Sequence, residues 1–585
     1  MNEIASWLLA LLPAPLAAGY LAPLIARSRL RPPAALFWPL SVGLGIGLFT
    51  NALTLVAFAG LTTARLWLIL AALWSTNALW GKWPHVGLSP AEWWRKLRQG
   101  QCGAWVGLAG AAILLVVLAQ ASYYPFTGDD EISRYAYFAR LILEKGKMIG
   151  DVRGYPPLLP AAYTSTFFAA GDIREQAAKM YPVLIAAMTV WATYALALRW
   201  FGQRAAAAAA LTLAATPLFM HWAPVAYVDI ASGLYFVLCA FALEIWRERL
   251  EPGWALLSGV LAGVALWTKQ AGFAVLPIMG LLVLIQFVRK WTRAEPEEAR
   301  RALVHGLLML AAAFASGGWW YLRNALYDGW GGAVPDAGLY HLLTAPRRPT
   351  QIIPFFGNFA DFGWLTAPLY LGGLGWAATA LRKPAVRRAL LWCGPFTLLW
   401  WWRFSFDARF LLAVLPFYAV LAGAAALAGW RRVEAAAPSR NRPFLCAAVS
   451  LSLAVAGIFQ AQLGGIIRWA THPGASYAQR LTRAKGDLYP TVQFLQMHVE
   501  PGTIIRSTDA RIRYYLIDRP IVVGYPDMTS LQEGSIFVVG SWSDSVYNRL
   551  GLQDSPLPHL DDARLFENIY TGPEGKMRAF RVLSQ

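Results

Sequence analysis

The chain has 585 residues, of which 57% are hydrophobic and only 14% are charged. A soluble protein is expected to carry about 25% charged residues, so the composition excludes an ordinary soluble enzyme. The formal net charge of +18 would suit a nucleic-acid partner. However, the Lys and Arg residues stand in short clusters between apolar runs, which is typical of the cytoplasmic loops of membrane proteins. We therefore expect no nucleic-acid partner.

Apolar runs long enough to cross a bilayer as helices recur along most of the chain. They predict a polytopic α-helical membrane protein with about 14 transmembrane helices, whereas an outer-membrane barrel would show short alternating segments. The predicted spans are about 4–26, 34–59, 64–81, 103–122, 177–198, 205–222, 230–246, 254–268, 272–288, 302–322, 361–381, 389–402, 410–430 and 443–465.

The basic clusters predict the orientation of these spans. The N-terminus lacks a basic region, and its first positive charges, from Arg27 onward, follow the first apolar run. This argues against a cleaved signal peptide and places the N-terminus outside. Alternation along the chain then puts the segment after residue 122 and the C-terminal part on the outer face.

Two shorter segments do not read as full spans. The stretch 132–150 has apolar residues at helical spacing, which predicts an amphipathic helix lying in the membrane interface. The stretch 156–170 is apolar but short and opens with two prolines, which predicts an interfacial or re-entrant helix.

The composition changes near residue 468. A helical stretch at 488–498 is followed by β-like runs at 503–505, 521–523, 536–539 and 579–582, separated by Gly, Pro and Asp. We predict a small C-terminal α/β soluble domain on the outer face. The predicted domains are 1–122 (N-terminal spans), 123–467 (membrane core) and 468–585 (α/β domain). The four cysteines fall in or beside apolar runs, which predicts no disulfide framework.

Three consecutive acids, Asp129, Asp130 and Glu131, follow the fourth predicted span. Acids at a helix N-terminus complement the helix dipole, which is the structural interpretation. Carboxylates near a bilayer are costly and tend to mark function, which is the alternative. Two adjacent acids can have different pKa values, so that one takes a proton while the other orients it or binds a cation.

A second acid, Asp229, begins the seventh predicted span. It could cap that helix, because Asp is a preferred N-cap residue, and it could also belong to a site. His221 precedes it and fits a packed or interfacial histidine better than a metal ligand. Tyr155, Pro156 and Pro157 carry no reactive group, but the prolines fix the backbone before an apolar helix and would shape a cavity wall.

Four cations are predicted at outer helix ends. Lys269, Arg323, Arg403 and Arg409 could snorkel to lipid headgroups. Alternatively, they form a convergent set, which is what a phosphate leaving group needs, and Arg adds bidentate geometry. No Walker A loop, GxSxG elbow, HExxH or Cys/His metal spacing is present, so ATP-driven transport, serine hydrolysis and zinc proteolysis lack support.

The order of these elements resembles the GT-C glycosyltransferases, integral membrane enzymes that use lipid-linked sugars. It looks most like the branch of the protein O-mannosyltransferases and the lipid A aminoarabinose transferases. The resemblance rests on Asp129-Asp130-Glu131, Arg134-Tyr135-Ala136, Pro156-Pro157-Leu158, Asp229, Leu266-Trp267-Thr268-Lys269, Trp319-Trp320-Tyr321-Leu322-Arg323-Asn324 and Asp407-Ala408-Arg409-Phe410-Leu411-Leu412. Three extra helices precede the acids here, and the triplet leaves the register of the family's acidic pair open.

The resemblance implies an inverting transfer of a sugar from a polyprenyl-phosphate donor to an acceptor hydroxyl, on the outer face of a bacterial inner membrane with both termini extracytoplasmic. Asp129 or Asp130 would be the base, with Glu131 and Asp229 in the same catalytic set. Lys269, Arg323, Arg403 and Arg409 would bind the donor phosphate, and Tyr135, Tyr155, Pro156, Pro157 and His221 would shape the cavity.

The same resemblance implies a lipid, glycan or protein acceptor and membrane lipids as partners. No cofactor is expected to be obligatory, although hard carboxylate ligands at Asp129, Asp130 and Asp229 would suit a divalent cation such as Mg or Mn. Two alternatives remain. A transporter or lipid flippase would place its ionisable residues near the membrane midplane. A polysaccharide polymerase or ligase would share the chemistry.

Overall fold

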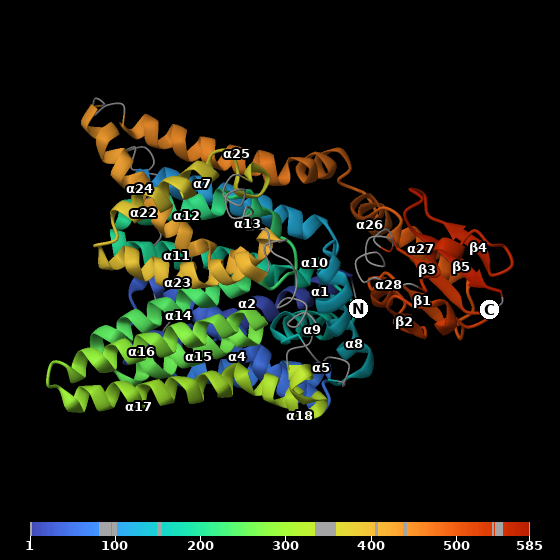
Figure 1. The fold of residues 1–585 in the computed structure, drawn as a ribbon, viewed down its shortest axis with the longest axis horizontal. Coiled ribbons are helices and arrows are strands. Elements are labelled where there is room, and N and C mark those ends of the chain that lie inside the picture. The colour runs from blue at the N-terminus through green and yellow to red at the C-terminus, as the bar shows by residue number, and fades with distance from the viewer. Residues whose placement is uncertain are drawn as a thin grey trace. The chain divides into compact units, whose positions relative to one another are not determined.

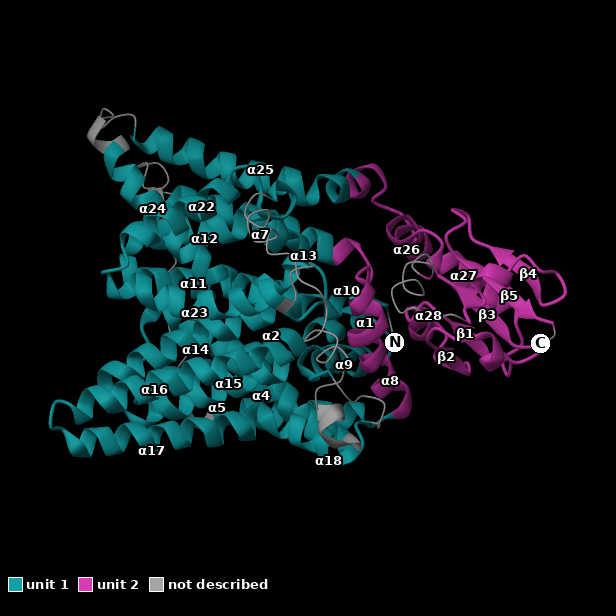
Figure 2. Cartoon of the chain, in the orientation of Figure 1, with its two compact units in different colours: residues 1–121, 146–467 teal, residues 122–145, 468–585 magenta. Residues whose placement is uncertain are grey.

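The computed structural model describes residues 3–80, 95, 102–148, 155–333, 358–403, 407–436, 442–540, 543 and 554–583. The chain divides into two compact units (Figure 2). Unit 1 contains residues 1–121 and 146–467, and unit 2 contains residues 122–145 and 468–585. The segment 122–145 is thus grouped with the C-terminal domain, which differs from the predicted boundary at residue 123.

Helices make up the described part of unit 1 (Figure 1). In chain order they are α1 (Glu3–Leu11), α2 (Pro13–Gly19), α3 (Ala22–Arg27), α4 (Ala34–Phe58), α5 (Thr63–Trp80), α7 (Cys102–Tyr123), α9 (Leu158–Ala170), α10 (Glu175–Ala178), α11 (Met180–Phe201), α12 (Gln203–Ala215), α13 (Pro217–Trp222), α14 (Asp229–Arg249), α15 (Pro252–Thr268), η2 (Gln270–Ala274), α16 (Val275–Trp291), α17 (Pro296–Ala313), η3 (Phe314–Gly318), α18 (Trp319–Ala333), α21 (Phe359–Phe362), α22 (Thr366–Thr379), α23 (Pro384–Arg403), η5 (Ala408–Ala413), α24 (Leu415–Ala436) and α25 (Arg442–Thr471).

Eight helical segments in the described ranges are long and apolar enough to cross a bilayer. They are Glu3–Arg27, Ala34–Phe58, Gly103–Tyr123, Glu175–Phe201, Asp229–Arg249, Gln270–Trp291, Pro296–Tyr327 and Arg442–Thr471. All eight coincide with predicted spans, so the prediction of a polytopic helical membrane protein is confirmed. The other predicted spans also fall on helices, such as α15, but the total of about 14 spans stays a prediction.

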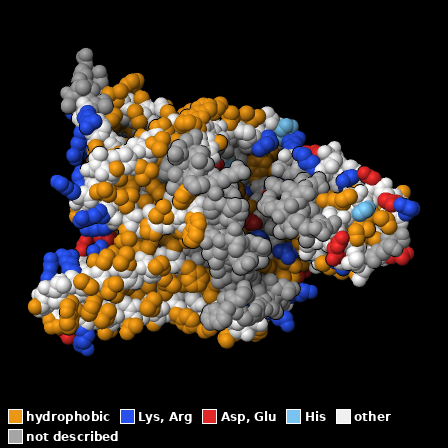
Figure 3. Space-filling view, viewed as in Figure 1, with side chains coloured by type: hydrophobic (Ala, Val, Ile, Leu, Met, Phe, Trp, Pro, Cys, Tyr) orange, Lys and Arg blue, Asp and Glu red, His pale blue; other side chains and the backbone are white. Residues whose placement is uncertain are grey.

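The surface of unit 1 has the pattern expected of such a protein. Figure 3 shows hydrophobic side chains along the sides of the helices and Lys and Arg gathered near the turn from α16 to α17. That turn carries several of the basic residues that predict a cytoplasmic loop.

Helix α9 is the short apolar segment that follows the two prolines. Pro157 precedes its first residue, and Gly171 ends it with φ +67°, a left-handed conformation that favours glycine. All thirteen residues of α9 are buried. The helix is therefore packed inside the protein and is too short to be a full span, as predicted.

Glycines bring two segments close together near the C-terminal end of α15. A Cβ on Gly263 would lie 2.4 Å from the carbonyl oxygen of Ala313, and one on Gly317 would lie 1.8 Å from the carbonyl oxygen of Gly263. Because these contacts are with backbone, only glycine fits at either position. The close approach lets the π-helix η3 lie directly against α15 and places α18 beside the end of α15.

Unit 2 contains a five-stranded mixed sheet. Its strands are β1 (Ile505–Ser507), β2 (Ile521–Val523), β3 (Ile536–Val539), β4 (Phe566–Thr571) and β5 (Arg578–Val582), in the order β2-β1-β3-β5-β4. Strand β1 is parallel to β2 and β3, and β5 is antiparallel to β3 and β4. Helices α26 (Tyr477–Lys485), α27 (Leu488–His498) and α28 (Ile512–Tyr515) complete the predicted α/β domain.

The segment 122–145 of unit 2 contains the acidic triplet. It forms a π-helix, η1 (Glu131–Ala136), which continues as α8 (Tyr137–Lys145), so the predicted helix at 132–150 is present in its described part. Both η1 and α8 pack against α28 of the C-terminal domain. Their apolar side chains are buried by protein on this side.

Two of the cysteines, Cys239 and Cys393, are free and buried. Cys446 is disulfide-bonded, which the prediction of no disulfide framework does not anticipate. Disulfide pairing cannot be deduced from cysteine spacing alone.

Candidate active site

An ion-pair cluster lies at one end of the helices in unit 1. Lys269 Nζ donates to Asp229 Oδ1 at 2.7 Å, and Arg409 Nε lies 3.5 Å from Asp229 Oδ2. Arg409 Nη2 is also 3.3 Å from Asp407 Oδ2. The Asp229 side chain is only 4% exposed and that of Arg409 only 11%. Buried charges of this kind are stable only when they are paired, so the cluster is a built feature and not a set of surface charges.

The local sequence explains how these residues meet. Asp229 is the first residue of α14, Lys269 directly follows α15, and Arg409 lies in η5. A Cβ on Gly233 would be 2.7 Å from the carbonyl oxygen of Leu412, so a glycine one turn into α14 lets η5 approach. The structure gives Asp229 no capping hydrogen bond, because Val228 is the N-cap residue. The Asp229 carboxylate instead forms ion pairs with Lys269 and Arg409.

Aromatic rings surround the two cations. The Lys269 ammonium lies 4.1 Å from the centroid of the Phe410 ring. The Arg409 guanidinium lies 4.7 Å from the Tyr227 ring and 5.1 Å from the Trp222 ring. These rings restrict the cations to one place and keep bulk water away from them.

A cavity of about 360 Å³ adjoins this cluster. Its polar lining consists of His221, Asp361, Asp407, Arg409 and Gln460, with Trp222 as an aromatic wall. The hydroxyl-rich surface of a sugar fits such a mixture of carboxylates, amide and indole, because each hydroxyl can both donate and accept a hydrogen bond. His221, predicted as a cavity wall, lies in this lining.

Arg323 has a separate aromatic setting in α18. Its guanidinium lies over the rings of Phe58, Trp320 and Tyr327 at 4.9, 4.7 and 5.3 Å. Next to it, Tyr321 donates a hydrogen bond to the carbonyl of Leu266 at 2.9 Å.

The contact between Tyr321 and Leu266 joins the two motifs, 266–269 and 319–324, that carry the GT-C resemblance. The Trp267 ring also meets the Trp320 ring edge to face at 5.7 Å.

Arg403 is the last residue of α23, and its side chain lies outside the described part.

The three consecutive acids have three different environments in unit 2. The fully buried Glu131 accepts the backbone N–H groups of Thr127 and Gly128 at 2.7 and 2.5 Å. It therefore closes the turn before η1. Asp130 pairs with Arg134 one turn later, with Arg134 Nε 3.4 Å from Asp130 Oδ1.

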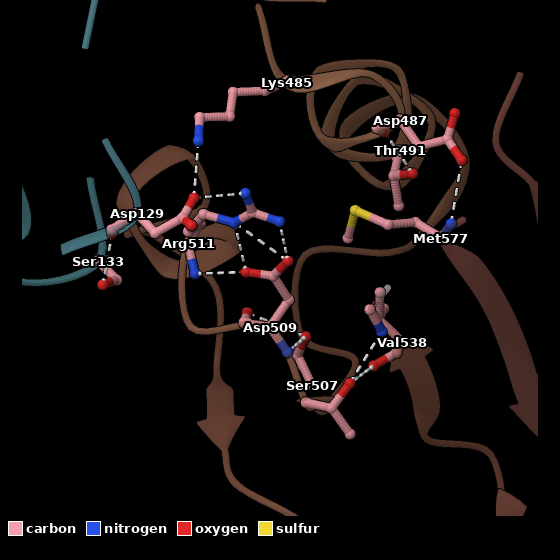
Figure 4. Close-up of polar contacts among 12 residues, drawn as sticks. Asp129, Ser133, Lys485, Asp487, Thr491, Ser507, Asp509, Arg511, Val538 and Met577 are labelled. Carbon is pink, nitrogen blue, oxygen red and sulfur yellow. Dashed lines mark hydrogen bonds and ion pairs between the residues drawn. The ribbon is translucent and has the colours of Figure 1, made fainter. Parts of the chain in front are cut away.

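Asp129 is held by two cations of the C-terminal domain (Figure 4). Lys485 Nζ lies 2.7 Å and Arg511 Nη1 2.8 Å from Asp129 Oδ1. Burial by itself raises the pKa of Asp129 and is the largest single influence. The two cations together outweigh it, so the pKa of Asp129 is lowered below its ordinary value. Asp129 is therefore ionised at neutral pH.

The cavity-shaping predictions fall at three places. Tyr135 is buried in η1 of unit 2. Tyr155 is half-buried, and Pro156 and Pro157 are buried at the start of α9 in unit 1. None of these four residues lines the cavity beside Arg409.

Three residues of the candidate site have no signal in the local sequence. Asp361 lies in the cavity beside Asp407, although it reads as the polar start of a span. Lys485 and Arg511 read as ordinary surface cations of a soluble domain. Only the folded chain brings them to Asp129, because Arg511 is 382 residues away in sequence.

The carboxylates predicted to suit a divalent cation contact protein cations in this structure. The described ranges contain no group of three or more His, Cys, Asp or Glu residues that could hold a metal. More directly, Asp129 and Asp229 each direct an oxygen at a lysine ammonium 2.7 Å away. One oxygen of each of these two acids is thus engaged by a lysine, and we derive no step through a metal.

Comparisons with known proteins give a family-model match and similar solved structures. Residues 155–320 match the family model for dolichyl-phosphate-mannose-protein mannosyltransferases. A comparison with curated protein sequences finds no match. The matched segment includes Tyr155, Asp229 and Lys269, and it ends before Arg323.

Among solved structures, the chain is similar to ArnT from Cupriavidus metallidurans bound to undecaprenyl phosphate. The identity is 18% and the TM-score 0.53, over 81% of this chain and 97% of that chain. The apo state of the same ArnT gives 18% identity and a TM-score of 0.52 over the same shares. The archaeal oligosaccharyltransferase AglB from Archaeoglobus fulgidus gives 12% identity and a TM-score of 0.48, over 80% of this chain and 74% of that chain.

The chain therefore shares the fold of this ArnT structure. The family-model match and this fold together indicate a glycosyltransferase, and the predicted resemblance to the GT-C superfamily is confirmed.

Proposed function

We propose that the protein is an inverting glycosyltransferase that moves a sugar from a polyprenyl-phosphate donor to an acceptor hydroxyl on the extracytoplasmic face. The observation that carries this proposal is the buried Asp229–Lys269–Arg409 cluster beside a polar cavity. It occurs in a fold shared with an ArnT structure that contains undecaprenyl phosphate.

The donor phosphate would bind at Lys269 and Arg409. A lysine ammonium has three donors, and the hydrogen bond to Asp229 uses one of them. Asp229 would hold both cations in place before the donor binds, which is how a preorganised site stabilises charge that develops during a reaction. Arg323 and Arg403 would add positive charge for the same phosphate. The sugar would lie in the adjoining cavity against Trp222.

The transfer itself would need a base and a leaving group. Asp129 or Asp130 accepts the proton of the acceptor hydroxyl as its oxygen attacks the anomeric carbon. The bond from that carbon to the phosphate oxygen breaks on the opposite side, so the configuration inverts. Polyprenyl phosphate leaves with the electron pair, and Lys269 and Arg409 stabilise its charge. Glu131 would shape the acidic turn and take no part in proton transfer.

The position of the charged residues supports a transferase over a transporter or flippase. Transporters place ionisable residues near the bilayer midplane, often in broken helices. Here Asp229 is the first residue of a membrane helix and Lys269 follows the last residue of the next.

Charge bias of the loops supports an inner-membrane protein with both termini extracytoplasmic and the acidic turn on the same outer face. The acceptor would be a lipid, glycan or protein that presents a hydroxyl there.

Transfer by the purified protein tests this proposal. It would be incubated with polyprenyl-phosphate sugars, and released polyprenyl phosphate would be measured for wild type, Asp229→Asn and Glu248→Gln. Glu248 lies at the far end of α14 in an exposed pair with Arg199, so its variant is the matched control. We expect turnover in wild type and the control and loss of turnover in Asp229→Asn. Solute uptake in proteoliposomes without turnover of any donor would favour the transporter.

A further inference from the structure

Arginine side chains join the segment 122–145 to the C-terminal domain at several points between Tyr124 and Arg140. Arg468 Nε donates to the Tyr124 hydroxyl at 3.0 Å, and Arg513 Nη2 donates to the Ser133 carbonyl at 2.6 Å. In the other direction, Arg140 Nη1 donates to the Tyr514 carbonyl at 2.5 Å. The segment is thus an integral part of unit 2, although it comes from the middle of the membrane sequence.

The contact at Asp129 differs from these, because it joins charged groups on both sides. Arg511 is only 8% exposed and is oriented by Asp509. Arg511 Nε donates to Asp509 Oδ1 at 2.9 Å and to Oδ2 at 3.1 Å, and the other end of the same guanidinium reaches Asp129. Figure 4 shows this chain of contacts from Asp509 through Arg511 to Asp129.

Lys485 reaches Asp129 from another element. It is the last residue of α26, whose start is fixed by a capping box between Ser476 and Gln479. Lys485 and Arg511 both donate to Oδ1 of Asp129, at 2.7 and 2.8 Å. The Asp129 side chain is still 48% exposed. Two cations of the domain therefore bind the same oxygen, while about half of the side chain stays exposed.

We propose that Arg511 and Lys485 are positioning residues of the transfer reaction, which act by fixing the carboxylate of Asp129 through its Oδ1. This inference rests on the proposed function. It gives the C-terminal domain a specific part in that function. The domain fixes the geometry of an acid that comes between predicted membrane segments in the sequence. The lowered pKa of Asp129 agrees with this arrangement.

The geometry predicts how the two cations differ. Arg511 bridges two carboxylates with a planar fork, so lysine cannot replace it at both ends. Lys485 makes a point contact, so arginine at position 485 can restore the charge and the hydrogen bond. Lys485→Arg is therefore the conservative variant for rescue, and Lys485→Gln is the variant that removes the contact.

The test compares Lys485→Gln, Lys485→Arg and Arg511→Gln in the full-length protein, with Arg564→Gln as a matched control. Arg564 is 88% exposed and pairs with Asp562 on the same domain. Steady-state kcat and donor KM are measured together with hydrogen exchange of residues 122–145. We expect Lys485→Gln to lower kcat about tenfold or more with donor KM changed less than about twofold, since misplacing a reacting group mainly affects the chemical step.

We further expect faster exchange of 122–145 in Lys485→Gln, recovery of kcat in Lys485→Arg, and wild-type behaviour in Arg564→Gln. If Lys485→Gln and Arg511→Gln keep wild-type kcat while Asp129→Asn loses it, the positioning role is wrong and the proposed function stands. Equal loss of activity and melting temperature, without rescue by Lys485→Arg, also overturns the positioning role. If the wild-type protein shows no turnover with any donor, the proposed function itself is wrong. The Lys485 side chain is 18% exposed, against 10% for Arg511, so its variants keep the test valid where Arg511→Gln fails to fold.

Discussion

Lys269 Nζ lies 2.7 Å from Asp229 Oδ1, although the two residues are 40 positions apart. The pair joins the start of α14 to the end of α15 at one end of the membrane helices. Breaking a buried ion pair by removing one partner typically costs about 3–5 kcal/mol, because an uncompensated charge is left behind. Apolar side chains could pack these helix ends without the desolvation cost of buried charges, so packing alone does not explain the pair. The pair therefore connects the fold to the proposed chemistry.

Removal of one member of this pair should affect both stability and transfer. Lys269→Met leaves Asp229 with Arg409 as its ion-pair partner, so we expect a lower melting temperature and at least about a hundredfold loss of kcat/KM, within the range seen when a group that stabilises charge is removed. Thermal unfolding and donor turnover measure the two effects. The double variant Asp229→Asn with Lys269→Met should recover melting temperature but not turnover. Recovery of turnover in the double variant would show that the pair is only structural.

The glycine contact between α15 and η3 should be intolerant of any side chain. A Cβ at Gly263 would lie 2.0 Å from Ser316 Oγ and 2.4 Å from the Ala313 carbonyl oxygen, so Gly263→Ala must push η3 away. We expect destabilisation of about 1–3 kcal/mol, as for other overpacked sites, and a lower kcat because Lys269 lies just beyond α15. Gly280→Ala in α16 is the control, since nothing lies within 4 Å of the added carbon. Equal melting temperatures for the two variants would contradict this packing.

Arg323 should act through its aromatic surroundings as well as its charge. Arg323→Lys keeps the charge but loses the planar group that lies over Phe58, Trp320 and Tyr327. We expect Arg323→Gln to raise donor KM about tenfold and Arg323→Lys to give an intermediate value, because Lys and Arg are not interchangeable at stacked sites. Initial rates over a range of donor concentrations measure both. An unchanged KM in Arg323→Gln would remove Arg323 from the donor site.

Low pH should weaken the ion pairs that Asp129 makes with Lys485 and Arg511. The pKa of Asp129 is lowered in the folded protein by Arg511 and Lys485, against the effect of burial. Its contribution to stability is thus present above the unfolded pKa near 3.8 and is lost as the pH falls through the lower folded value. Acid unfolding followed by circular dichroism should show wild type more stable than Asp129→Asn at neutral pH, with the difference lost as the pH falls through the lowered folded pKa. A difference that grows on acidification would contradict the ion pairs.

The sequence predicts the membrane helices well and their meeting points only in part. Helix α14 is predicted at 230–246 and observed at Asp229–Arg249, because an unbroken apolar run can form little else in a bilayer. Strand β4 is missed, since Phe566–Thr571 contains Glu567 and Asn568 and has no apolar alternation. Its place in the sheet comes from pairing with β5.

The residues of the candidate site were also predictable only in part. The order of motifs is enough to single out Asp229, Lys269 and Arg409, which the structure places in one cluster. The partners of Asp129 could not be predicted, because a lysine and an arginine in a soluble domain carry no local sign of a contact more than 350 residues away. Such contacts depend on tertiary packing, which periodicity and composition do not encode.

The most direct test of the central claim is transfer from a polyprenyl-phosphate sugar by purified Asp129→Asn, Asp130→Asn and wild-type protein in lipid nanodiscs. All three should insert and melt cooperatively, since both side chains are partly exposed at the surface of unit 2. We predict that wild type releases polyprenyl phosphate and glycosylates an acceptor, with inversion at the anomeric carbon, and that at least one of the two variants loses transfer. Full transfer activity in both variants would contradict the assignment of the acidic turn as the catalytic base.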